Sequence, residues 1–120
     1  MLVSEFVKKS IEQDKRNVFE ECLDDFEFLP EQLIGFYKKA NPVDVEVNMD
    51  GNSVKMYPAE ELESLQEDYS LGKECFVFAT CNSDPIFMYG EKVYTCYHGS
   101  KSSEKELIAE DFDSFLRMID

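Results

Sequence analysis

The residues that could do covalent chemistry in this chain are one histidine, His98, and four cysteines, Cys22, Cys75, Cys81 and Cys96. Cys96 comes two residues before His98, so in a strand both side chains would lie on one face. A thiol beside an imidazole can act as a nucleophile with its base. Such a pair more often faces a core or a groove, and any histidine-centred triad would have to use His98. We therefore predict no catalytic site and no enzyme.

The same side chains are poor candidates for a metal site. Cys75, Cys81, Cys96 and His98 contain no Cys-x-x-Cys pair, whereas structural zinc sites usually have closely spaced ligand pairs. The segment after Met1 has no basic leader, no long apolar run and no small-residue cleavage site. We therefore expect reduced, buried thiols in a cytoplasmic protein. No metal and no other cofactor is predicted.

Neighbouring carboxylates are a further candidate, because paired acids catalyse glycoside hydrolysis. Three of the adjacent acidic pairs in the chain are candidates, Asp24/Asp25, Glu60/Glu61 and Glu110/Asp111. All three are expected on helix flanks or polar faces, where solvated surface is the simpler interpretation. The sequence also has no glycine-rich phosphate loop.

The overall charge is the strongest signal in the composition. Twenty-six acidic residues face twelve Lys and Arg, which gives a formal net charge of −14. Such a surface repels nucleic-acid phosphates and anionic membranes, and it attracts basic proteins. No apolar run reaches the ~20 residues that span a bilayer. We therefore predict a protein partner, with no direct nucleic-acid or membrane binding. The alternative is that the charge serves only solubility, and the oligomeric state stays open.

Acidic residues gather in two consecutive segments, 43–57 and 58–68, which contain a single base, Lys55. We predict that these segments form a partner-binding surface from Asp44, Glu46, Asp50, Tyr57, Glu60, Glu61, Glu63, Glu67 and Asp68. The tyrosines that could act as aromatic anchors are Tyr57, Tyr69, Tyr89 and Tyr97. For any one tyrosine, the edge of the core is an equally good interpretation.

The elements that must position this surface begin with helices. Apolar residues recur at helical intervals from Val3 to Ile11. Asn17, followed three residues later by Glu20, predicts the cap of a second helical stretch that ends near Phe26. One helix or two could cover residues 2–27.

Strand signals dominate the remainder of the chain. A helix opened by Pro30 ends at Asn41-Pro42, and alternating residues 43–57 around Asp50-Gly51 predict a tight hairpin. A short acidic helix follows from Pro58. Further strands are predicted at 75–79, 85–89 and 92–98, with a terminal helix at 108–119. This order predicts one α+β domain over residues 1–120, with a mostly antiparallel central sheet flanked by helices.

A series of short landmarks follows one another along the chain. In order they are Leu29-Pro30, Phe36-Tyr37, Glu61-Leu62, Phe78-Ala79, Asp84-Pro85-Ile86, Val93-Tyr94, His98-Gly99 and the segment 108–116. From about residue 17 to residue 119, this order resembles the SUKH superfamily. That superfamily joins bacterial immunity proteins to fungal regulators of cell-wall synthesis.

The resemblance implies an α+β fold and a role without catalysis. Bacterial members of the superfamily are largely immunity proteins, which bind and block a cognate polymorphic toxin in the cytoplasm of the producing cell. The toxin is often a nuclease, and a nuclease domain is usually basic because it binds phosphates. Eukaryotic members imply the alternative, a regulatory or scaffold protein. The expectation is an immunity protein whose acidic surface blocks a basic toxin domain.

Overall fold

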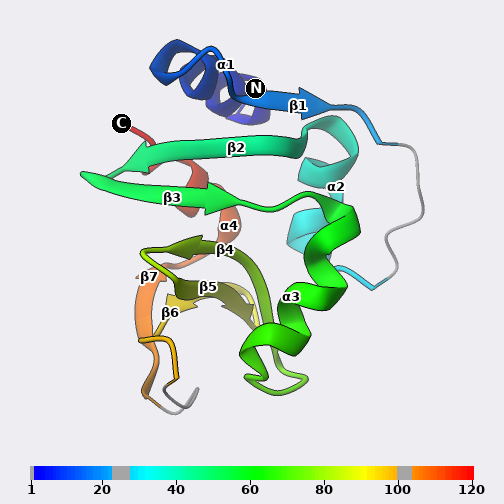
Figure 1. Cartoon of the computed structure of the whole chain (residues 1–120), viewed down its shortest axis with the longest axis vertical. Helices are drawn as coiled ribbons and strands as arrows, with labels where there is room; N and C mark the ends of the chain where they lie inside the picture. The colour runs from blue at the N-terminus through cyan, green and yellow to red at the C-terminus, as the bar shows by residue number, and fades with distance from the viewer. Residues whose placement is uncertain (1, 23–27, 100–103) are drawn as a thin grey trace.

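The computed structural model describes residues 2–22, 28–99 and 104–120. These residues form a seven-stranded antiparallel sheet in which each strand pairs with the next along the chain (Figure 1). The strands are β1 (Val18–Glu20), β2 (Asn41–Met49), β3 (Asn52–Met56), β4 (Cys75–Cys81), β5 (Asp84–Tyr89), β6 (Lys92–Thr95) and β7 (Glu106–Ala109). The helices are α1 (Leu2–Gln13), α2 (Glu31–Lys39), α3 (Leu62–Tyr69) and α4 (Phe112–Leu116), and the 3-10 turn η1 (Ala59–Glu61) precedes α3. The α+β class predicted from the sequence is confirmed.

The β2–β3 hairpin follows the sequence prediction closely. Asp50 and Gly51 form its two-residue turn with φ angles of 49° and 82°. Positive φ at both positions matches the right-handed twist of the strands that the turn joins. Val45, Val47 and Met49 are buried, and the polar residues between them are exposed. The hairpin therefore turns its acidic residues toward solvent.

A cluster of phenylalanine rings fixes α2 and α4 to one face of the sheet. Phe112 of α4 lies edge-to-face against Phe36 of α2, with ring centroids 5.3 Å apart. Phe78 of β4 lies edge-to-face at 5.4 Å from Phe112 and 5.3 Å from Phe115. Such contacts stabilise beyond the area that they bury. In Figure 1, α4 passes behind β3 and β4, whereas α3 descends beside β4 nearer the viewer.

The side chain of Gln66 attaches α3 to β4. Strand β3 pairs with β4 only through Lys55 and Met56, so the first half of β4 has no partner strand on that side. There, Gln66 Nε2 donates to the carbonyl of Val77 at 2.6 Å, and Gln66 Oε1 accepts from the Val77 N–H at 2.7 Å. One amide side chain thus continues the hydrogen bonding of the sheet where β3 ends.

The helix predicted from Val18 to Phe26 is wrong where the structure describes it, and residues 23–27 lie outside the described residues. Val18–Glu20 is instead strand β1, which pairs with β2. Asn17 does not cap a helix. It is 7% exposed, donates through Nδ2 to the Ser10 carbonyl at 2.8 Å, and accepts from the Glu46 N–H at 3.0 Å. These long-range bonds replace the local capping that the sequence suggested.

The end of the chain also differs from its prediction. The helix expected over 108–119 begins only at Phe112, because Glu106–Ala109 pairs with β6 as strand β7. Asp111 sets the start of α4 by accepting the Ser114 N–H at 2.7 Å, and this bond lowers the pKa of its carboxyl. The strand predicted over 92–98 ends at Thr95.

Replacement of Gln66 by alanine should destabilise the fold. The Val77 N–H and carbonyl would lose their partners in a half-buried position, so we expect a loss of about 2 kcal/mol in the free energy of unfolding. Urea denaturation measures this loss. Glu67→Ala, at the exposed neighbouring position, is the control and should change stability by less than about 0.5 kcal/mol. Equal effects of the two variants would contradict the role assigned to Gln66.

Candidate functional site

The carboxylates of the predicted surface are exposed on β2, the β2–β3 turn, η1 and α3. On β2, burial of Val45 and Val47 leaves Asp44 and Glu46 exposed. On α3, Leu62 and Leu65 are buried. The helical period then directs Glu63, Glu67 and Asp68 to solvent, and Glu60 and Glu61 of η1 are exposed as well. These acids are therefore exposed in the structure, as the sequence predicted.

A polar hollow of about 290 Å³ is lined by residues of the β2–β3 hairpin and by the end of α3. We use the name polar hollow for the surface formed by Glu46, Ser53, Lys55, Tyr57, Tyr69, Thr80, Asn82 and Ser83. Strands β2, β3 and β4, the end of α3 and the β4–β5 turn all contribute to it. The hollow brings Glu46 and Tyr57, two of the predicted site residues, onto one surface.

Two tyrosines of the polar hollow are held in place by hydrogen bonds. The Tyr69 hydroxyl donates to the Ser83 carbonyl at 2.6 Å. The hydroxyls of Tyr57 and Thr80 are 3.1 Å apart and hydrogen-bonded. Burial, with smaller effects of Tyr57 and of the carboxylates of Asp84 and Asp68, raises the pKa of Tyr69. Both rings are therefore rigid, half-exposed surfaces, as aromatic interface anchors require.

Lys55 lies inside the predicted acidic surface and in the polar hollow. Its Nζ atom lies 5.0 Å from the centroid of the Tyr57 ring, a cation–π arrangement. Its backbone pairs with Glu46 across the hairpin. Sequence reasoning identified Lys55 only as the single base among acids. It missed Thr80 and Ser83, because their place beside β3 depends on the β3–β4 register.

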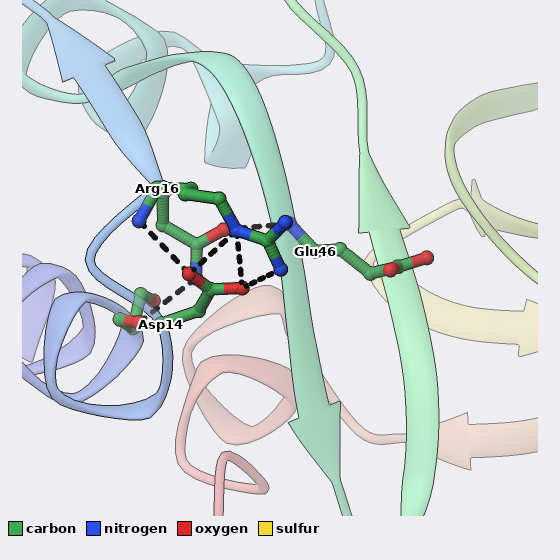
Figure 2. A network of polar contacts seen from close by, with 5 residues as sticks. Asp14, Arg16 and Glu46 are labelled. Atoms are coloured by element: carbon green, nitrogen blue, oxygen red, sulfur yellow. Dashed lines mark hydrogen bonds and ion pairs between the residues drawn. The ribbon is translucent and has the colours of Figure 1, made fainter.

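Arg16 lies near the acids of β2, but its side chain is bound by Asp14 (Figure 2). Its Nη2 atom lies 2.8 Å from Asp14 Oδ2, and its Nε lies 3.1 Å from Asp14 Oδ1. These bonds lower the pKa of Asp14 to about 2. The pKa of Arg16 is raised chiefly by Asp14 and less by Asp44 and Glu46. Asp14 therefore neutralises most of the positive charge that Arg16 would present to Asp44 and Glu46.

None of the eight predicted carboxylates forms an ion pair with another described residue. Among the described residues, the ion pairs are Arg16–Asp14, Lys92–Glu110 and His98–Asp84. Like charges on neighbouring exposed positions raise the local negative potential and attract cations. The surface can therefore bind a positively charged partner without first breaking internal ion pairs.

Asp50 is placed apart from the other predicted residues. It lies at the hairpin turn, where its N–H and that of Gly51 donate to the Asp120 carboxylate at 3.0 and 3.1 Å. Asp50 lines a different hollow from the one that contains Glu46 and Tyr57. The hairpin thus presents acids to two separate surfaces.

Cys96 and His98 do not share a strand face, because β6 ends at Thr95. Cys96 is buried, and burial, reinforced by the nearby Asp84 carboxylate, raises the pKa of its thiol. His98 has a side chain that is 66% exposed, with Nδ1 2.9 Å from Asp84 Oδ1. A raised thiol pKa reduces the thiolate fraction, the opposite of what activates a cysteine nucleophile. Cys81 is half-buried, and its thiol pKa is raised in the same way.

The chain matches no protein-family model, and no curated protein is significantly similar to it in sequence. Within the described residues, no group of three or more His, Cys, Asp or Glu side chains is arranged to hold a metal ion. Over the same residues, every helix is too short or too polar to cross a membrane.

The pKa of Asp14 provides a direct check on the Arg16 interaction. We expect an NMR titration to find the Asp14 pKa near 2, and Arg16→Gln to move it toward 3.8. Because the folded-state pKa is depressed, the stabilisation is complete above the unfolded pKa and is lost as the pH falls through about 2. An Asp14 pKa that Arg16→Gln leaves unchanged would contradict the neutralisation described above.

Proposed function

We propose that this protein is a non-catalytic binding module that neutralises a basic protein domain, in the manner of SUKH-type immunity proteins. The observation that supports this most is the set of exposed carboxylates on β2, η1 and α3, none of which is ion-paired with another described residue. The polar hollow, with its hydrogen-bonded Tyr57 and Tyr69, includes one of these carboxylates, Glu46.

The proposed mechanism is electrostatic and steric block. A toxin domain that cuts nucleic acid must bind phosphates with Lys and Arg, so its cleft is basic. Carboxylates of η1 and α3 would take the positions of phosphates in that cleft, and the long-range field would speed the encounter. The rings of Tyr57 and Tyr69 would then supply contact area that does not depend on salt.

A binding role also agrees with the chemistry of the remaining candidate residues. The raised thiol pKa of Cys96 disfavours a nucleophile, and Cys96 does not share a strand face with His98 because β6 ends at Thr95. We therefore assign the protein no catalytic step, and we propose the cytoplasm as its compartment because a producing cell must be protected there.

Removal of three charges from the acidic surface should weaken binding. The test protein carries Glu60→Gln, Glu61→Gln and Glu63→Gln, and binding is measured to a basic toxin domain chosen from the products of neighbouring genes. We expect affinity at low salt to fall about tenfold and the dependence on salt to become shallower. Calorimetry from about 50 mM to about 500 mM NaCl measures both effects.

A matched variant separates surface position from net charge. Glu5→Gln, Glu12→Gln and Asp113→Asn remove the same number of exposed charges from α1 and α4. We expect this variant to bind nearly as well as the unchanged protein and to protect cells from the toxin. Equal losses in the two variants would show that only net charge matters, and salt-independent binding would remove the electrostatic mechanism altogether.

A further inference from the structure

A groove of about 450 Å³ is distinct from the polar hollow and shares only Asp50 with the predicted acidic surface. It lies between the β2–β3 turn, the β4–β5 turn, β7 and the end of α4. Its apolar lining includes Met49, Val54, Ile86, Leu107, Phe115 and Met118. Leu107 of β7 is 49% exposed there. We call this surface the apolar groove.

The polar residues that line the apolar groove give it one sign of charge. Asp50 and Asp84 both line it, and no Lys or Arg is among its described lining residues. His98 orients Asp84 through contacts of 2.8 Å from its N–H and 2.9 Å from Nδ1. Asp120 lies next to Asp50 through its bonds to the hairpin turn. An occupant must therefore be apolar where it enters the groove and basic where it meets the surrounding acids.

The size and composition of the groove suit a side chain of a protein. Pockets of about 300–1,000 Å³ are typical of specific ligand sites. Met118 is half-exposed in the groove and Met49 is buried in its lining, and methionine packs well around different apolar shapes. A second copy of this chain is disfavoured, since its net charge of −14 would place further acids against Asp50 and Asp84.

We propose that the apolar groove binds a Leu or Phe side chain of a partner segment in which that residue is flanked by Lys or Arg. This inference rests on the proposed function for the sign of the partner's charge, and it adds the apolar anchor that carboxylates alone cannot provide. The flanking bases contact Asp50 and Asp84, and the apolar side chain contacts Leu107 and the two methionines.

Methionine methyl groups report occupancy of the groove directly. Protein labelled with 13C at the methionine methyls is titrated with the peptide Ac-KRLKFRK-NH2. We expect a shift in the signals of Met118, which is half-exposed in the groove, and of Met49, which is buried in its lining. The signals of Met56 and Met88, which are buried outside the groove lining, should stay in place. Two control peptides are Ac-KRAKARK-NH2, with the same charge, and Ac-EELEFEE-NH2, with the same apolar residues.

The outcomes separate this proposal from the proposed function. The groove proposal is supported if the signals of Met49 and Met118 shift with the peptide Ac-KRLKFRK-NH2 and with neither control peptide. If the alanine peptide shifts them equally, the groove proposal fails while the attraction of bases stands. If the glutamate peptide binds as well as the basic one, the charge requirement of the groove proposal fails, while the proposed function, which rests on the separate acids of β2, η1 and α3, stands. If no peptide shifts these signals at about 1 mM, the groove proposal alone is overturned.

A variant pair adds a test that does not depend on the peptide controls. Leu107→Ala removes a half-exposed side chain of the groove, so the fold should persist and peptide affinity should fall about fivefold. Ile11→Ala removes a 41% exposed apolar side chain of α1, outside the groove, and should leave affinity unchanged. Equal behaviour of the two variants would overturn the assignment.

Discussion

The contact between the phenylalanine rings of α2, β4 and α4 is the interaction on which the rest of the structure depends. Phe36, Phe78 and Phe112 are nearly inaccessible to solvent and lie edge-to-face. They hold two helices against one face of a sheet in a chain whose net charge of −14 opposes compaction. With that face covered, the alternation along β2 leaves no place for Asp44 and Glu46 except solvent. The acidic surface is thus a consequence of how the core is built.

Polar side chains at the borders of this core position the functional surfaces. Gln66 continues the hydrogen bonding of β4 where β3 ends, and this places α3, with its exposed acids, beside the polar hollow. Asn17 links the end of α1 to β2 at Glu46, and Asp14 holds Arg16 away from pairing with the acids of β2. Each link joins segments that are distant in sequence or neutralises a base. Together they leave the carboxylates free to interact with a partner.

The sequence predicted best those features that depend on neighbouring residues. The hairpin around Asp50-Gly51 and the exposure of its acids follow from local alternation and turn chemistry. The errors fall where distant pairing overrides local propensity, as in β1, whose Val18 pairs with Asp44, and in β7, which occupies part of a predicted helix. The polar hollow and the apolar groove could not be predicted, because they form where separate hairpins meet. A half-exposed Leu107 has no signal in a single sequence.

The central claim is that the acids of β2, η1 and α3 produce a concentrated negative potential. Paramagnetic relaxation by two nitroxides of equal size, one cationic and one anionic, measures this potential at each amide proton without any partner. The account predicts that the ratio of cationic to anionic relaxation is largest at Asp44, Glu46 and residues 60–68, well above its value along α1. A ratio that is uniform over the surface would contradict the account, because the negative charge would then be dispersed rather than concentrated.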